Sequence, residues 1–362
     1  MTLTPRLLAR ACAPLAFCVL LASAAPVAPP SHFVQRNLVS DGSIPAAHVD
    51  PNLVNSWGLA FNPYGFAWVA DADAGVSTLY DGNGNPQQLV VQIPGPPGED
   101  EPGEATGIVF NGSENFRVSK GTVNGASRFI FATEQGVIAG WAPNVDVTHA
   151  LIAVDNSATG ANYKGLAISG GGSGQLIYAA DFFHARVDVY DGSFQPASLP
   201  AGAFHDPGIP AGFAPFGIQA IGGDIYVTYA RQDAAGADEV TGPGLGYVDL
   251  YTPTGRLIKR VASRGRLNAP WGVALAPPGF GRYANTLLIG NFGDGRINAW
   301  EGTFGFPMGP LRRTDGTPVR IDGLWGIAFG NGVAEQPVNT LFFASGPDDE
   351  EHGLYGRLDL IR

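Results

Sequence analysis

The chain has 362 residues, of which 45% are hydrophobic and 15% are charged, and its formal net charge at pH 7 is −11. This hydrophobic content is sufficient for a globular core, whereas the acidic balance and the lack of a basic patch argue against nucleic acid as a partner. The only cysteines are Cys12 and Cys18. The remainder of the chain therefore has no disulfide, no thiolate nucleophile and no cysteine metal site.

The first 25 residues have the features of a secretory signal peptide. Arg6 and Arg10 precede an apolar stretch that begins at Ala11, and Ala22-Ser23-Ala24 follows as a small-residue cleavage site. The apolar stretch is too short for a membrane helix, which needs about 20 residues. We therefore expect residues 1–25 to be removed and the protein to be exported to the periplasm or the extracellular space.

A Pro-rich spacer at residues 26–31 precedes one predicted domain at residues 32–362. Closed all-β folds of this length commonly form a single domain. A lipid-attachment box ending at Cys18 is an alternative N-terminal signal, although Phe17 occupies a position where a small residue is needed. Without such an anchor we expect a monomer with no membrane span after processing.

One short pattern occurs six times along the domain: a large or β-branched residue, then Gly, then an apolar strand-like stretch. The glycines of successive copies are 49, 58, 52, 55 and 54 residues apart. The copies are residues 57–61, 106–110, 164–168, 216–220, 271–275 and 325–329. A strand-rich repeat of this length predicts a β-propeller with one four-stranded sheet, or blade, per repeat. We therefore predict an all-β, six-bladed β-propeller.

Each repeat continues with further aromatic and β-branched stretches bounded by turn residues, which is the signature of strands. Second strands are expected at residues 66–70, 129–133, 176–180, 224–229, 286–290 and 340–344. Third strands are expected at residues 76–80, 137–141, 186–190, 246–251, 296–300 and 356–360. Fourth strands, such as residues 89–93, 150–154 and 257–261, are less regular.

The glycine of the repeat has a steric explanation. Inner strands crowd around the propeller axis, and a residue without a side chain allows the backbones of neighbouring blades to approach each other. We expect Trp57, Trp271 and Trp325, which precede three of these glycines, to be buried between blades as core residues and not to form a ligand platform.

The last repeat ends after its third strand, and an unassigned strand at residues 33–39 precedes the first repeat. Pairing residues 33–39 with residues 356–361 would complete the last blade and remove a bare sheet edge. We therefore predict that an N-terminal strand closes the ring.

Several stretches resemble one family of uncharacterised secreted bacterial β-propellers, some of which carry PEP-CTERM sorting tails and which are distantly similar to NHL-repeat propellers. The most specific stretches are Gly290–Asn298 and Gly323-Leu324-Trp325-Gly326. The resemblance implies the fold and secretion but no established activity. Because the sequence ends at Arg362 without an apolar tail, we expect free export and no sorting to the envelope.

Loops that lead into the inner strands and loops between second and third strands lie on one face of a propeller, where function is usually found. We select from these loops the groups able to bind a ligand. The candidate ligand-binding residues are Asp181, His184, His205, Asp206, Arg231, Asp294 and His352. A competing explanation for each is a solvated residue or a group that hydrogen-bonds its own turn.

The same face offers ligands for Ca²⁺ or another divalent cation. Carboxylate and amide oxygens suit Ca²⁺, and imidazole nitrogens suit a transition metal. Asp71, Asp181 and Asn291 end second strands at equivalent positions. The candidate metal ligands are Asp71, Asp181, Asn291, His184 and His352.

Standard catalytic motifs are absent: there is no H-E-x-x-H, G-x-S-x-G or phosphate-binding G-x-x-x-x-G-K sequence. Three functions remain open. The first is a binding or scaffold protein that recognises a small molecule, a glycan or a protein through its acidic loop face. The second is a metal-assisted hydrolase, lactonase or lyase with its site at the axial channel, which fold analogy alone supports. The third is a structural envelope component.

Overall fold

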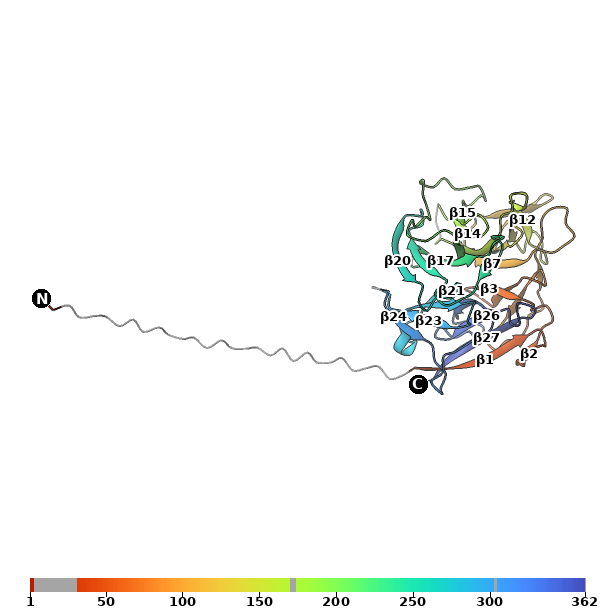
Figure 1. The fold of residues 1–362 in the computed structure, drawn as a ribbon. Helices are drawn as coiled ribbons and strands as arrows, with labels where there is room; N and C mark the ends of the chain where they lie inside the picture. The colour runs from red at the N-terminus through yellow and green to blue at the C-terminus, as the bar shows by residue number, and fades with distance from the viewer. Residues whose placement is uncertain (3–30, 170–173, 303–304, 362) are drawn as a thin grey trace.

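The described residues of the chain form six blades of mainly antiparallel strands, arranged around an axis as a β-propeller (Figure 1). The computed structural model describes residues 1–2, 31–169, 174–302 and 305–361. Almost all of the predicted signal peptide and spacer therefore lies outside the described residues. Within the described part, no helix is long and apolar enough to cross a membrane.

Blades 1, 2 and 3 follow one another along the chain. Blade 1 contains β3 (Ser56–Phe61), β4 (Ala67–Asp71), β5 (Val76–Tyr80) and β6 (Val91–Gln92). Blade 2 contains β7 (Ala105–Phe110), β10 (Phe129–Thr133), β11 (Val137–Trp141) and β12 (Leu151–Asp155), with a hairpin of β8 (Arg117–Lys120) and β9 (Val123–Ala126). Blade 3 contains β13 (Tyr163–Ile168), β14 (Ile177–Asp181) and β15 (Arg186–Tyr190), preceded by a 3₁₀ helix at Ser157–Thr159.

Blades 4, 5 and 6 complete the ring. Blade 4 contains β16 (Phe213–Ile221), β17 (Asp224–Gln232), β19 (Tyr247–Tyr251) and β20 (Leu257–Ser263), and the short β18 (Glu239–Val240) pairs with β17. Blade 5 contains β21 (Pro270–Leu275), β22 (Leu287–Asn291), β23 (Ile297–Trp300) and β24 (Pro307–Pro310), with a 3₁₀ helix at Gly281–Tyr283. Blade 6 contains β25 (Leu324–Phe329), β26 (Leu341–Ser345), β27 (Leu354–Ile361) and β1 (His32–Ser40), which also pairs with β2 (His48–Val49).

The six-bladed fold and its closure by an N-terminal strand are confirmed. Strand β1 pairs antiparallel with β27, with Phe33 opposite Leu360 and Val39 opposite Tyr355. Figure 1 shows the orange-red β1 beside the blue β27 at the lower edge of the ring. The Phe33 ring packs 4.9 Å from the Phe280 ring of blade 5, so this strand also fixes the neighbouring blade.

The repeated glycines bring the inner strands together. A Cβ on Gly58 would lie 2.6 Å from the carbonyl oxygen of Thr106 in blade 2, and a Cβ on Gly326 would lie 2.7 Å from that of Trp57 in blade 1. Each of the six glycines faces the inner strand of the following blade in the same way. The ring can therefore close tightly only with glycine at this position.

A β-bulge accompanies the glycine in every blade. In blade 1, Ser56 pairs with Asp71 and Leu59 pairs with Val69, so Trp57 and Gly58 together face one residue. Such a bulge reorients the side chain of its first residue. The residues that precede the glycines consequently meet at the axis.

The tryptophans fill the axis of the ring, which corrects the expected position between adjacent blades. Trp57 and Trp325 are fully buried as predicted and stack with ring centroids 3.5 Å apart, whereas Trp271 is only partly buried. Trp57 of blade 1 also meets Trp271 of blade 5, which is not a neighbouring blade, at 6.3 Å. Phe216 packs against Trp325. The bulges thus build an aromatic plug across the axis.

Six further apolar clusters stabilise the ring, one at each interface between neighbouring blades. Blade 5 and blade 6, for example, share Ile297, Leu324, Leu341 and Leu358. Because successive side chains of a strand point to opposite faces of the sheet, each strand contributes residues to the contacts with both neighbouring blades.

Blade 3 departs from the expected four strands, because its described part has only three. After β15 the chain forms a turn in which the Ala197 amide donates to the Val189 carbonyl at 2.8 Å. A second turn begins at Pro200, whose carbonyl accepts from the Ala203 amide, and the Phe204 amide donates to the Gly255 carbonyl in blade 4. The chain therefore leaves the outer edge of β15.

We expect deletion of residues 31–40 to cause aggregation or a large loss of stability, because β27 would be left as a bare sheet edge beside the site vacated by Phe33. Size-exclusion chromatography and thermal unfolding measure the effect. A soluble, monomeric deletion variant that melts like the parent protein would disprove the closing role of β1.

We expect Gly58→Ala to destabilise the fold by about 1–3 kcal/mol, the usual cost of overpacking, because the added methyl group meets the Thr106 carbonyl. Urea unfolding measures the change in the free energy of unfolding. Gly112→Ala is the matched control, since its Cβ would lie 3.4 Å from the Phe110 side chain and its backbone has no positive φ. Equal stability of the two variants would contradict the steric role of Gly58.

Candidate functional site: an acidic mouth on the axis

Lys164 occupies one of the six axial positions that the bulges create. It precedes Gly165 in β13, where Trp57, Trp271 and Trp325 stand in their blades. The side chain is buried, with the residue 2% exposed. Its ammonium lies 5.3 Å from the centroid of the Trp57 ring. The ammonium group of Lys164 thus lies on the aromatic plug.

Lys164 is held by groups from three other blades. Its Nζ forms an ion pair with Glu134 of blade 2 and another with Asp238 of blade 4, at 3.2 Å. The Trp271 indole of blade 5 donates to the Lys164 carbonyl at 2.7 Å. Burial opposes ionisation of this amine, but Glu134, Glu239 and Asp238 together outweigh that effect and raise the pKa of Lys164. The residue is therefore a fixed cation at any physiological pH.

Carboxyl groups surround this cation in excess. They come from blades 1, 2, 4 and 6, and each interacts electrostatically with Lys164 or with another member of the group. We call the region formed by Lys164 and these groups the axial mouth. Its carboxyl groups are those of Asp73, Glu104, Glu134, Asp238, Glu239 and Glu350.

Burial and neighbouring negative charges raise the pKa values of three of these carboxyl groups. Burial raises the pKa of Glu239 to about 8, and Glu350 and Glu134 contribute in the same direction against Lys164. Burial, together with Glu134, raises the pKa of Glu350 to about 7. Burial and Glu134 also raise the pKa of Glu104. The mouth therefore holds carboxyl groups whose ionisation is disfavoured by burial and by their like-charged neighbours.

An extension of blade 4 brings two of these carboxyl groups to the axis. Strand β17 continues beyond its sheet and returns through β18, with Gln232 opposite Glu239. The Gln232 amide donates to the Phe182 carbonyl at 2.7 Å, and the Asn162 amide donates to Ala237 at 3.3 Å. Blade 3 thereby positions the extension beside Lys164.

Asn55 links the mouth to the plug in blade 1. Its amide donates to Asp73 at 3.0 Å, and its carbonyl oxygen accepts the indole N–H of Trp57 at 2.8 Å. Asn55 has a φ of 47°, a left-handed conformation that asparagine tolerates better than most residues. The floor of the mouth is thus aromatic and its walls are acidic.

Two of the predicted residues, Asp181 and His184, are in contact. The buried carboxylate of Asp181 lies 2.7 Å from the Nδ1 of His184, and Arg186 lies 3.4 Å from the same oxygen. The amide of His184 also donates to Asp181 at 3.2 Å. This pair lies at the turn of blade 3, and its role in binding remains a prediction.

Asp206 and His205 lie in the segment that leaves blade 3, not in a loop of the mouth. Asp206 forms an ion pair with Arg260 of β20, which in turn lies 3.1 Å from Asp249. His205 and Arg231 are exposed, and Arg231 lies near the end of β17, opposite Val240. Their hydrogen bonds and ion pairs, within the described residues, do not join them to Lys164.

The remaining predicted metal ligands have partners of their own. Asp71 is fully buried, its oxygens accept hydrogen bonds from Ser56 and Thr78, and burial raises its pKa well above the ordinary value. Its position therefore suits a structural hydrogen-bond acceptor. Asn291 donates to Asp294 at 3.0 Å and to the Arg266 carbonyl at 2.8 Å.

His352 lies in the loop of blade 6 that also carries Glu350. Its Nδ1 lies 2.7 Å from an Asp41 oxygen. Ligand atoms of Asp348, Glu351 and His352 lie within 4.8 Å of one another. Among the described residues this group is the one whose spacing would suit a divalent cation, and it combines predicted His352 with two exposed carboxyl groups that were not selected.

Sequence reasoning did not select Lys164, Glu134, Glu239 or Glu350 as site residues. One signal was present: at Lys164 a charged residue stands where four of the other five repeats have tryptophan or phenylalanine. A charged side chain that points to a packed axis needs groups of opposite charge nearby. The carboxyl groups that neutralise Lys164 therefore identify the site.

No protein-family model matches the chain. Over 89% of its length the chain is 34% identical to uncharacterized protein R648 and 32% identical to uncharacterized protein L690 of Acanthamoeba polyphaga mimivirus, covering 78% and 84% of those proteins. The chain belongs to the family of these mimivirus proteins. It is also 36% identical over 227 residues to uncharacterized protein R640 of the same virus, of which it covers 41%.

Solved structures with a similar fold are β-propellers. A glucose dehydrogenase aligns with 90% of this chain and 99% of its own, with a TM-score of 0.55 and 12% identity. A streptogramin B lyase aligns with 91% of this chain and 98% of its own, with a TM-score of 0.50 and 14% identity. At this level of identity the likeness confirms the propeller fold alone.

We expect Glu239→Gln to stabilise the protein at pH 8.5 and to leave its stability nearly unchanged at pH 5. The pKa of Glu239 is higher in the folded protein than in the unfolded chain, so folding favours the protonated form. Stability therefore falls as pH rises from about 4.5 to about 8, and glutamine removes this fall. Melting temperatures of both proteins between pH 5 and pH 9 provide the measurement, and parallel curves would contradict the burial of an ionised Glu239.

Proposed function

We propose that this protein is a binding propeller whose axial mouth recognises a positively charged organic group, an ammonium or a guanidinium, on a small molecule or a peptide. The observation that carries the proposal is the convergence of six carboxyl groups from four blades around a single ammonium. A cationic ligand would supply the missing counter-charge. It would also lower the pKa values of Glu239 and Glu350 toward the ordinary range.

The aromatic floor favours an organic cation over a bare metal ion. The ammonium of Lys164 already lies over the faces of Trp57 and Phe182, at 5.3 and 6.0 Å from the ring centroids. Cations over aromatic faces are attracted by the ring quadrupole, and carboxylates add directional acceptors. Trp271 packs edge-on against Trp57 and extends the aromatic plug below the ammonium.

An acid–base enzyme is the second candidate function. Glu239 and Glu350 have pKa values of about 8 and about 7, and carboxyl groups that titrate near neutrality are suited to proton transfer. The lyase and the dehydrogenase with a similar fold are enzymes by name, but their likeness to this chain extends to the fold alone. The metal-assisted hydrolase or lactonase predicted from the sequence would in addition need a divalent cation.

Export of the protein is also proposed, on the basis of residues 1–25 with their charged start, apolar stretch and small-residue cleavage site. The resemblance to secreted bacterial propellers favours the same location, whereas the relatives described above are viral. An acidic, cysteine-free domain suits either the periplasm or the extracellular space.

Isothermal titration calorimetry with spermidine and agmatine tests the binding function. We expect binding that weakens as sodium chloride is added, because the attraction is electrostatic. The double variant Glu239→Gln, Glu350→Gln should lower the affinity at least tenfold, which corresponds to about 1.4 kcal/mol. Near-ultraviolet circular dichroism confirms that the variant is folded.

Glu335→Gln is the matched control, because Glu335 is an exposed carboxyl group outside the mouth, and it should leave the affinity unchanged. The proposal is wrong if neither amine binds, or if the double variant binds as well as the parent protein. Binding of calcium chloride without binding of either amine would replace it with a metal-binding function.

A further inference from the structure

The outer edge of blade 3 is open at a place where blade 1 is closed. In both blades the third strand ends in a tyrosine and then a tight turn: the Gln87 amide donates to Leu79 at 2.9 Å, and the Ala197 amide donates to Val189 at 2.8 Å. Beyond this turn blade 1 adds β6, in which Val91 pairs with Ser77. Blade 3 adds no such strand within the described residues.

The register identifies the position that is missing. Ser77 lies three residues before Tyr80, and Val187 lies three residues before Tyr190, so the two residues are equivalent. The partner of Ser77 is Val91, whereas the partner position of Val187 is empty because the chain turns away at Pro200. Val91 is completely buried in the core between blades 1 and 2.

The edge of β15 retains the backbone groups that a fourth strand would use. The Val189 carbonyl accepts from Ala197, so it points away from β14. In an antiparallel ladder this direction alternates along the strand, and the N–H and C=O of Val187 therefore point outward as well. No described residue makes a hydrogen bond to either group.

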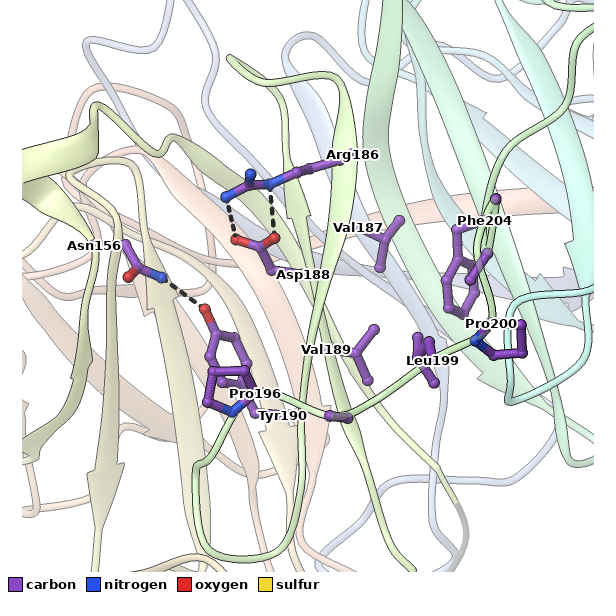
Figure 2. A pocket seen from close by; sticks show the side chains of 13 residues that line it. Asn156, Arg186, Val187, Asp188, Val189, Tyr190, Pro196, Leu199, Pro200 and Phe204 are labelled. Atoms are coloured by element: carbon purple, nitrogen blue, oxygen red, sulfur yellow. Dashed lines mark hydrogen bonds and ion pairs between the residues drawn. The ribbon is translucent and has the colours of Figure 1, made fainter.

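A cavity of about 500 Å³ lies between this edge and the departing segment. Figure 2 shows Val187 and Val189 on one side and Leu199 and Phe204 on the other. Val187 and Leu199 are only partly buried members of the core between blades 3 and 4. The cavity falls within the range of about 300–1,000 Å³ that is usual for ligand sites.

The charges at the edge of the cavity neutralise each other. Arg186 and Asp188 form an ion pair at 2.7 Å, and Asp188 also accepts a hydrogen bond from the Tyr163 hydroxyl at 3.0 Å. The groove therefore complements an uncharged segment better than a charged one. A strand residue opposite Val187 would direct its side chain to the same face, among Leu199 and Phe204.

We propose that this groove binds an extended, uncharged peptide segment of a partner protein, which adds to β15 as the fourth strand of blade 3 and places a Val or Ile side chain opposite Val187. Strand addition of this kind obtains affinity from main-chain hydrogen bonds and specificity from side-chain pockets. Blade 6 provides the precedent within the molecule, because β1 completes it from the far end of the chain. The site is separate from the axial mouth and does not depend on the function proposed for it.

The test uses the fourth strand of blade 1 as the probe. A fluorescently labelled peptide of residues 89–93, Leu-Val-Val-Gln-Ile, is titrated with the full-length protein, and its anisotropy is measured. We expect saturable binding. A second peptide is N-methylated at its central valine, which corresponds to Val91. It lacks the N–H that would donate to the Val187 carbonyl, and it should bind at least tenfold more weakly.

Protein variants locate the site. Leu199→Ser should weaken binding of the unmodified peptide several-fold, whereas Leu275→Ser, at an exposed leucine of blade 5, should leave it unchanged. The proposal is overturned if the peptide does not bind, if both peptides bind equally, or if Leu199→Ser has no effect. A concentration-dependent dimer that the peptide fails to dissociate would overturn it in favour of pairing between two copies of this edge.

Discussion

The close approach of the six inner strands is the constraint on which the rest of this structure depends. Each strand carries a glycine that faces the inner strand of the next blade, and each has a bulge beside that glycine. The bulge directs the preceding side chain to the axis, because two residues there face one residue of the neighbouring strand. The aromatic plug is therefore a consequence of how the ring closes.

The candidate site follows from one departure from this arrangement. Five blades direct apolar or small side chains to the axis, and blade 3 directs the ammonium of Lys164. A buried cation is tolerated only with counter-charges nearby, and Glu134 and Asp238 provide them. Further carboxyl groups such as Glu239 and Glu350 share this ammonium, and their pKa values are raised by burial first and by the neighbouring carboxyl groups second.

The outer edges of the blades show a second constraint, that a sheet edge must be paired or protected. Blade 6 obtains its last strand from β1, more than 300 residues away in sequence. Blade 3 has only a short turn and a segment that crosses to blade 4, and it leaves part of β15 open. The outer sheet edge is thus paired with a further strand in blade 6, whereas it is left partly unpaired in blade 3.

The sequence by itself determined the number of blades, the positions of most strands and the closing strand, because period-two alternation and glycine spacing are local properties of the chain. It also placed Asp181 and His184, three residues apart, among the candidate site residues, and the structure brings these two into contact. The axial mouth was decided only by the tertiary structure, since its carboxyl groups extend from Asp73 to Glu350 and meet through the ring geometry. Whether Trp57 packs between blades or on the axis depends on the bulge, and no local pattern in the sequence specifies that direction.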